Sequence, residues 1–431
     1  MARLGTLVIV AIVGAVVFLL ANKRATVEEP VPAASAVDSS QLTIGQQAPA
    51  VVAIQPPANP YWQAVVRQYQ SYLQQSLKRG VAPGVGIAIV RDSSVLFLAG
   101  LGYRDFATRD TLDVHSLFRL GSVSKSFAGV LTAILVQEKV LAWDDKVVKY
   151  VPGFRLKSRA HTDSLTIAHL LSHTTGLPYH AYTDRVDDGA HFDTLLYHLR
   201  DLDLIGPPGK FYSYQNVGFS LISKVIEAAT SKSYEQVMQE KVFTPLNMQT
   251  SSMTFDAMAS TTNKARPHSR QRKSWRPMAV STTYYNVGPA GGVNASINDM
   301  ALWLRALTHP HDTLLSAETR AELFRPAVKA IARNRNFRKW KKSKGSYYAL
   351  GWRVLTFKDD TVNYHGGYAN GYRSEVAIKR DDRIGICVLV NAPGPLADQA
   401  IPEFFRIYEA YRPQILKWEK ENINPLIART K

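Results

Sequence analysis

Cysteine is almost absent from this 431-residue chain, in which Cys387 is the one example, so no internal disulfide can form. The sequence also lacks a Cys-x-x-Cys pair, a His-Glu-x-x-His motif, an acidic cluster at ligand spacing and a glycine-rich phosphate loop. These absences argue against structural zinc, zinc-protease and P-loop nucleotide-binding classes. We therefore expect no metal ion or other cofactor. A chain of this length can bury a sizeable apolar core without such supports.

Acidic residues are scarce as well. The chain has 52 Lys and Arg residues against 35 Asp and Glu residues, a net charge of +17. Most of the excess lies in residues 264–276, with six basic residues and no acidic one, and in residues 325–344, with nine and none. One interpretation of these segments is solvated surface, and the other is contact with anionic lipid headgroups or a polyanionic envelope polymer. No nucleic-acid-binding motif accompanies the charge, so we do not expect nucleic acid as a partner.

The one long hydrophobic run lies at the N-terminus. Residues Leu4–Ala21 carry no charge, and a helix of that length spans about 27 Å, close to the thickness of a bilayer core. A cleaved signal peptide needs small residues at −1 and −3, and Leu19 would occupy −3 for a cut after Ala21. We therefore expect residues 1–24 to be an uncleaved membrane anchor, with a cleaved signal segment as the alternative. Residues 25–59, rich in Ala, Val, Pro, Ser and Gln, are predicted to be a flexible linker.

Residues 60–425 have the pattern of one mixed domain. Apolar residues at helical spacing predict helices over 61–78 and 399–419, and helical patterns dominate between 124 and 325. Short β-rich runs, the first two forming a predicted hairpin, lie at 86–90, 94–99, 347–356, 362–365, 373–379 and 384–391. We expect an α/β (α+β) fold, with an antiparallel sheet built from both chain ends, flanking helices and a mostly helical lobe inserted in the middle.

A serine and a lysine stand three residues apart at the start of one predicted helix. Ser122 follows a short apolar stretch, and Lys125 lies one helical turn later on the same face. A serine hydroxyl becomes a good nucleophile when a base takes its proton, and a lysine with a lowered pKa is such a base. A helix N-terminus also offers N–H groups to an oxyanion. On its own, this motif equally describes a capping serine with a surface lysine.

Two later segments carry complementary groups. Tyr214-Gln215-Asn216 follows the turn at 206–209 and precedes a predicted helix. Its tyrosine can relay a proton, and its asparagine can hold a substrate carbonyl and the lysine. The run Tyr-His-Gly-Gly-Tyr at 364–368 is predicted near the end of a strand, where glycines allow close approach of a substrate backbone. Taken singly, each segment also has a structural interpretation, as a helix cap and as a strand-to-turn junction.

Taken together, the three elements resemble the serine β-lactamase and penicillin-binding-protein superfamily, in which the Ser-x-x-Lys element is known. The Tyr-x-Asn and His-x-Gly elements are similar to those of its class C branch, which includes β-lactamases, D-Ala-D-Ala carboxypeptidases, D-aminopeptidases and esterases. Residues 170–178 (LLSHTTGLP) and 289–301 (PAGGV followed by DMA) are also similar to segments of that branch. The resemblance covers roughly residues 60–410 and implies a β-lactamase/transpeptidase-like fold.

The resemblance also implies roles for individual residues. Ser122 would attack a carbonyl and become acylated. Lys125 and Tyr214 would share the proton transfers of acylation, and which of them is the base stays open. Asn216 would position the substrate. The backbone N–H groups of Ser122 and Tyr368 would form the oxyanion hole.

The third element departs from the pattern of class C β-lactamases, which carry lysine where this chain has His365. A histidine holds a substrate carboxylate only when it is protonated, which disfavours β-lactam hydrolysis and favours esterase or peptidase activity. Gly366, Gly367 and Tyr368 would border the substrate. His180 would face the same cleft, with a solvated loop histidine as the alternative.

These inferences predict a serine hydrolase on a single-pass anchor in the cell membrane, with its catalytic domain outside the cytoplasm, in the periplasm. Its expected partner is a small-molecule or peptide substrate, either of the D-amino-acid or peptidoglycan type or an ester or amide. The alternative is a catalytically silent relative that binds peptides or acts as a scaffold. An adaptor driven by the basic segments is a third hypothesis.

Overall fold

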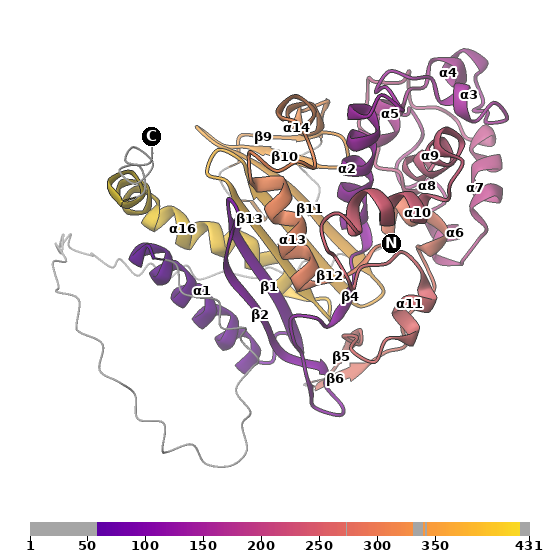
Figure 1. The fold of residues 1–431 in the computed structure, drawn as a ribbon. Coiled ribbons are helices and arrows are strands. Elements are labelled where there is room, and N and C mark those ends of the chain that lie inside the picture. The colour runs from indigo at the N-terminus through magenta and orange to yellow at the C-terminus, as the bar shows by residue number, and fades with distance from the viewer. Residues whose placement is uncertain (1–57, 273, 331–338, 341–342, 423–431) are drawn as a thin grey trace, which may run out of the picture. The chain divides into compact units, whose positions relative to one another are not determined.

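The computed structural model describes residues 58–272, 274–330, 339–340 and 343–422 (Figure 1). The predicted anchor, residues 1–24, and the predicted linker up to residue 57 lie outside this part of the chain. Among the helices within it, none combines the length and apolar character needed to cross a bilayer. The membrane anchor therefore stays a prediction.

An antiparallel sheet forms the centre of the fold. Its strand order over the described residues is β3-β2-β1-β13-β12-β11-β10-β9-β8. β1 and β13 lie side by side, with Val85 opposite Val390 and Ile89 opposite Ile386, so the two chain ends build one sheet as predicted. The strands are β1 (Gly84–Arg91), β2 (Ser94–Asp105), β3 (Asp110–Thr111), β8 (Val328–Lys329), β9 (Gly345–Tyr348), β10 (Arg353–Thr356), β11 (Thr361–Ala369), β12 (Tyr372–Lys379) and β13 (Ile384–Val390).

Two predicted strands need correction. Residues 347–356 do not form one strand, because Gly351 adopts a φ of +81° in a turn that separates β9 from β10. The strand predicted at 362–365 continues to Ala369 as β11. His365 and the two glycines after it therefore lie inside a strand and not at a strand-to-turn junction.

Helices cover both faces of the sheet (Figure 1). Val85 and Ile87 of β1 belong to the core beneath α1 (Pro60–Lys78) and α16 (Pro395–Asn422), the two helices predicted at the chain ends. Ala88 and Val90 of the same strand belong to the core beneath α13 (Ile297–Thr308). Burial on both faces explains why β13 is apolar along its length, since all its residues are buried.

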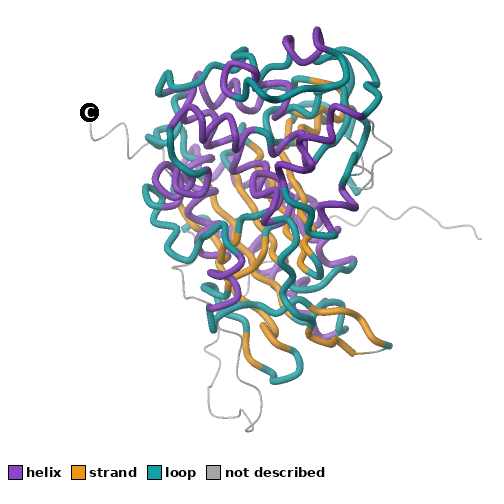
Figure 2. The backbone as a smooth tube through the Cα atoms, turned by 90° about the vertical axis from the view of Figure 1, so that its right-hand side faces the viewer, coloured by secondary structure: helices purple, strands orange, loops and turns teal. Residues whose placement is uncertain are grey.

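A mostly helical lobe is inserted between α2 (Ser124–Gln137) and α13, as predicted. Figure 2 views the molecule from the side of this lobe, with helices and loops in front of the strands. Two short strand pairs and further helices complete the fold. The remaining elements are β4 (Leu117–Arg119) with β7 (Asn294–Ser296), β5 (His268–Gln271) with β6 (Ser274–Pro277), and the helices α3 (Val147–Tyr150), α4 (Arg159–Ser164), α5 (Ile167–Leu171), α6 (Thr183–Asp187), α7 (Phe192–His198), α8 (Asn216–Ser220), α9 (Ile222–Thr230), α10 (Tyr234–Met238), α11 (Phe255–Ser260), α12 (Gly288–Gly291) and α14 (Ala317–Phe324).

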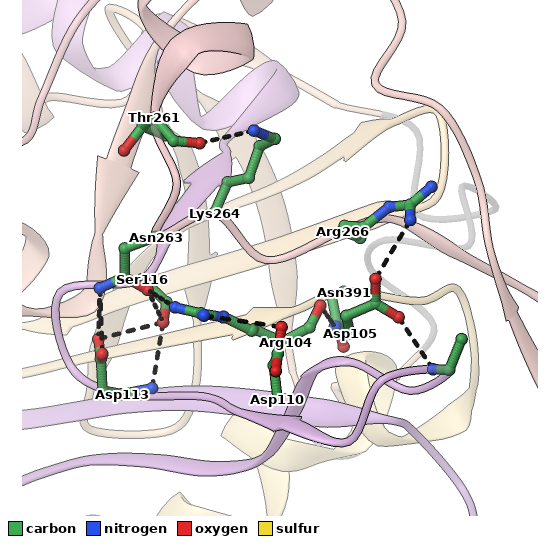
Figure 3. A network of polar contacts seen from close by, with 11 residues as sticks. Arg104, Asp105, Asp110, Asp113, Ser116, Thr261, Asn263, Lys264, Arg266 and Asn391 are labelled. Atoms are coloured by element: carbon green, nitrogen blue, oxygen red, sulfur yellow. Dashed lines mark hydrogen bonds and ion pairs between the residues drawn. The ribbon is translucent and has the colours of Figure 1, made fainter.

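Basic segment 264–276 is partly bound into the fold, as the polar network of Figure 3 shows. Arg266 Nη1 forms an ion pair with Asp105 Oδ2 at 3.2 Å. Trp275 is 5% exposed, and its indole N–H donates to the Gly80 carbonyl at 3.2 Å. These residues attach the β5–β6 hairpin to its neighbours, so the net charge overstates the free basic surface of this segment.

Residues 339 and 340 of basic segment 325–344 are also packed into the fold. Trp340 is buried, with its ring centroid 5.4 Å from that of Tyr364. Lys339 Nζ lies 2.7 Å from Glu375 Oε2, and the Glu375 side chain is fully buried. A buried carboxylate requires a charged partner. Lys339 therefore has a structural role, which the count of basic residues did not reveal.

Helix α2, which carries Lys125, packs closely on the turn between β9 and β10. The ring of Trp352 in this turn stacks on Trp303 of α13 with 5.5 Å between centroids, and Trp303 stacks on Phe127 of α2 at 4.3 Å. A Cβ added to Gly129 would lie 2.3 Å from the Leu350 carbonyl oxygen. This contact sets how near the helix lies to the sheet.

Gly129→Ala should therefore destabilise the fold by about 1–3 kcal/mol, as expected for an overpacked site, although alanine ordinarily favours a helix over glycine by about 1 kcal/mol. Equilibrium denaturation of the full chain measures the effect. Gly153→Ala is the control, because no atom lies within 4 Å of its added Cβ, and it should change the free energy of unfolding by less than about 0.5 kcal/mol. Equal stability of the two variants would contradict the packing argument.

Candidate active site

Ser122 lies in a short 3-10 turn, Gly121–Val123, directly before α2. The turn is joined to the lobe through the Leu120 N–H, which donates to the Val293 carbonyl at 2.9 Å. Ser122 is half-buried, whereas its neighbours on both sides are buried. The structure thus places the serine hydroxyl at the start of a buried helix with one side accessible.

The Lys125 amine is fully buried beside this serine. Its Nζ lies 2.8 Å from Asn216 Oδ1, 2.9 Å from the Ala290 carbonyl oxygen and 3.4 Å from Ser122 Oγ. Burial holds the pKa of Lys125 well below its ordinary value, and the positive charge of Arg353 lowers it further. A neutral amine has two N–H donors and one lone pair. With its donors directed at Asn216 and Ala290, the lone pair is left for the Ser122 proton.

Tyr214 lies on another side of the serine. Its ring centroid is 4.7 Å from Lys125 Nζ and 4.3 Å from the ring of His173. Burial raises the pKa of Tyr214, while the charge of Arg353 and hydrogen bonding to Ser122 oppose that rise. The phenol is therefore protonated at neutral pH and can pass a proton to or from Ser122. Both groups reach the serine, but Tyr214 would act as the base only in its phenolate form.

His173 holds the Tyr-x-Asn element in position. It adopts a φ of +57° and is buried. Its Nδ1 accepts from the Gln215 N–H at 3.1 Å, and its carbonyl accepts from the Ser213 N–H at 2.8 Å. Asn216 then begins α8, with its side chain between Lys125 and Thr183. His173 was recognised in the sequence only as part of the 170–178 segment, and its neighbours in the sequence gave no sign that it positions Ser213 and Gln215.

His365 does not meet substrate directly in this structure, because it is fully buried. Its Nε2 lies 2.9 Å from the Tyr348 hydroxyl, and its Nδ1 lies 3.2 Å from Arg353 Nη1. Burial holds the pKa of His365 well below its ordinary value, with further lowering by Arg353 and Lys125. The imidazole is therefore neutral, so it cannot supply the positive charge that a lysine would at this position.

The backbone of β11 lies against the turn that carries Ser122. A Cβ on Gly367 would be 2.0 Å from the Leu120 carbonyl oxygen and 3.1 Å from Ser122 N. A Cβ on Gly121 would be 2.9 Å from Tyr368 N. Glycine is therefore needed for this approach, which brings the predicted oxyanion donors, the N–H groups of Ser122 and Tyr368, to the same part of the site. Gly366 faces the opposite side of the sheet, where its Cβ would meet the Tyr364 hydroxyl and Glu375.

Exposed aromatic rings form the rim of the site. His180 is exposed, and its ring centroid lies 5.3 Å from that of Tyr214. Its neighbour Tyr179 is 54% exposed and Tyr368 is 53% exposed. His180 is thus both a solvent-exposed loop residue and a neighbour of the candidate proton relay. Over the described residues, no group of three or more His, Cys, Asp or Glu side chains is arranged to hold a metal ion.

The sheet with its inserted lobe, and the serine beside a buried lysine, define a β-lactamase-type hydrolase fold. The family model described as Beta-lactamase matches residues 69–407, and the chain belongs to this family.

Particular relatives extend the comparison. The chain is 24% identical over 331 residues to Protein flp of Staphylococcus aureus strain N315, covering 75% of this chain and 63% of that one. It is also 24% identical over 350 residues to Unguisins hydrolase ungD of Aspergillus violaceofuscus, covering 75% and 61%. The chain therefore spans less than two thirds of the length of these relatives.

Solved structures show the same fold. The octameric penicillin-binding protein homologue from Pyrococcus abyssi superposes with a TM-score of 0.68 at 24% identity, covering 79% of this chain and 77% of that chain. A structure titled SurE superposes with a TM-score of 0.63 at 18% identity, covering 83% and 76%. The predicted superfamily and fold are thus confirmed.

Acylation of Ser122 should slow as the pH falls through the lowered pKa of Lys125, because a protonated amine cannot accept the serine proton. Lys125→Met should reduce the acylation rate about 10²–10⁴-fold, the usual contribution of a general base. Stopped-flow labelling with an acylating probe measures both effects. Lys232→Met, which removes an exposed lysine, is the control. A near-normal rate in Lys125→Met would assign the base role to Tyr214.

Proposed function

We propose that the protein is a serine hydrolase that works through an acyl-enzyme on Ser122. The observation that carries the proposal is the buried amine of Lys125, 3.4 Å from Ser122 Oγ, with Asn216 and Ala290 as acceptors for its N–H groups. A lysine in this setting serves as a base at neutral pH. A silent scaffold has no need of a buried, uncharged amine beside a half-exposed serine.

The reaction follows from this arrangement. Ser122 Oγ forms a bond to the substrate carbonyl carbon while its proton passes to Lys125 or Tyr214. The N–H groups of Ser122 and Tyr368 donate to the carbonyl oxygen as it becomes an oxyanion. The bond to the leaving amine or alcohol breaks, and the leaving group takes up that proton. Water then attacks the acyl-enzyme, releasing the acid product and regenerating Ser122.

For substrates, we propose peptides, including those with D-amino acids, and esters or amides. The neutral, buried His365 leaves the third element without the cation that would bind a β-lactam carboxylate. The exposed rings of Tyr179 and Tyr368 favour substrates with an apolar group next to the scissile bond. One relative is itself named a hydrolase. A catalytically silent peptide-binding protein is the alternative.

We also propose that the N-terminal apolar run tethers the domain to the outer face of the cell membrane. The run of uncharged residues at 4–21 supports an anchor. Members of the branch that this sequence resembles are commonly exported, which supports a location outside the cytoplasm. Exposed basic side chains in segments 264–276 and 325–344 would then face anionic lipid or envelope polymer.

Labelling the full chain with a fluorescent penicillin and with a fluorophosphonate, followed by intact mass and peptide mapping, tests the mechanism. We expect the fluorophosphonate to modify Ser122, and penicillin to react more slowly because the carboxylate-binding cation is missing. Ser122→Ala should abolish labelling while changing the melting temperature little, since the serine is half-buried. Labelling that persists in Ser122→Ala, or no labelling of the folded wild type, would contradict the proposal.

A further inference from the structure

We infer that Arg353 is a positioning residue of the acylation step: its buried guanidinium fixes a positive charge beside Tyr214 and His365 that favours the proton-accepting forms of Lys125 and Tyr214, the neutral amine and the phenolate. The inference rests on the proposed function. No motif of the sequence pointed to this residue.

The geometry places Arg353 directly behind the catalytic groups. It is the first residue of β10 and is 3% exposed. Its guanidinium carbon lies 5.5 Å from the ring centroid of Tyr214 and 6.0 Å from that of Tyr364. Its Nη1 lies 3.2 Å from His365 Nδ1. His365 Nδ1 also lies 3.1 Å from the Gly366 carbonyl oxygen, and its Nε2 lies 2.9 Å from the Tyr348 hydroxyl, so both ring nitrogens are engaged.

A charge at this place is costly, so it calls for an explanation. Taking a guanidinium out of water costs several kcal/mol unless its surroundings compensate. Burial disfavours the charged form of Arg353, and ionisation of Tyr214, Tyr212 or Tyr348 would favour it, so its pKa stays above its ordinary value. Aromatic faces also attract cations. A guanidinium is not deprotonated in proteins, so Arg353 stays charged here, which a buried histidine would not do.

The neighbouring histidines do not supply this charge. Burial is the largest cause that lowers the pKa of each of them, and the charge of Arg353 lowers it further; these residues are His173, His180 and His365. The third element thus holds a neutral His365 in contact with a permanently charged arginine from the adjacent strand. In class C β-lactamases the resemblance places a cation at the position of His365 on β11, whereas here the cation is Arg353 on β10, in the interior of the protein.

The charge of Arg353 lowers the pKa of both candidate bases. Like-charge repulsion from Arg353 lowers the pKa of Lys125, and attraction for the phenolate opposes the burial-induced rise in the pKa of Tyr214. Removing the charge raises the pKa of whichever group is the base. The titratable and charged groups that face the pair from the packed elements are Tyr179, His180, His173, Tyr212, Tyr284, Tyr348, Arg353, Tyr364 and His365.

The test is the pH profile of fluorophosphonate labelling at Ser122 in the full chain. Arg353→Met should move the ascending limb to higher pH by about one unit or more, the size expected for removing a charge within about 10 Å of the base at an effective dielectric constant near 20. Arg353→Lys keeps a charge and should leave the limb within a few tenths of a unit of wild type. Tyr348→Phe, which removes a contact to His365 without changing charge, should lower the rate without moving the limb.

An unmoved limb in folded Arg353→Met, or an equal shift in Tyr348→Phe, would overturn the inference. If melting curves show that Arg353→Met is unfolded, Arg353→Gln is the second charge-removing variant. If that variant is unfolded as well, Arg353→Lys decides, because a shifted limb in this charged variant overturns the inference and an unshifted one supports it. Absence of Ser122 labelling in the wild type would refute the proposed function itself, so the two failures are distinguishable.

Discussion

The site depends on one interaction, the enclosure of the Lys125 amine between two oxygen acceptors. Asn216 Oδ1 and the Ala290 carbonyl oxygen come from the helical lobe. The helix that carries the amine is held by the turn between β9 and β10, where Gly129 meets Leu350. Neither half of the molecule creates a buried, uncharged amine alone. The lobe provides the two acceptors, and the turn between β9 and β10 sets the position of the helix that carries Lys125. The proposed chemistry at Ser122 therefore requires the lobe and the sheet to be correctly packed together.

The side chains around this amine are aromatic rings that carry polar groups. The ring of His173 lies 4.3 Å from that of Tyr214 and 4.7 Å from that of Tyr348. These rings exclude water, which strengthens electrostatic effects inside the site. One polar contact within the cluster joins the Tyr348 hydroxyl to His365 Nε2 at 2.9 Å. Such a cluster contributes no carboxylate charge, which would stabilise the protonated form of the Lys125 amine and raise its pKa.

The sequence was sufficient to predict the sheet built from both chain ends, and the residues it proposed as catalytic, Ser122, Lys125, Tyr214 and Asn216, lie together in the structure. Their motifs are short and lie at the starts of predicted helices, where the spacing of residues indicates which side chains share a face. Arg353 escaped notice because its function depends on partners from other strands, and its own segment resembles an ordinary strand. His365 was predicted as a substrate-facing residue, but sequence spacing cannot show that a ring is covered. The structural role of Lys339 was hidden for the same reason, since Glu375 lies 36 residues away.

The pairing of β1 with β13 has a consequence for how the molecule is made. Val85 finds its partner in Val390, so a ribosome must add some three hundred residues before the centre of the sheet can close. Contacts so distant in the chain form slowly, and the apolar faces of the early strands stay uncovered in the meantime. Ser122 and its helix are synthesised early, yet they meet β11 only near the end. The contacts that surround Ser122 can therefore form only after β11 has been synthesised.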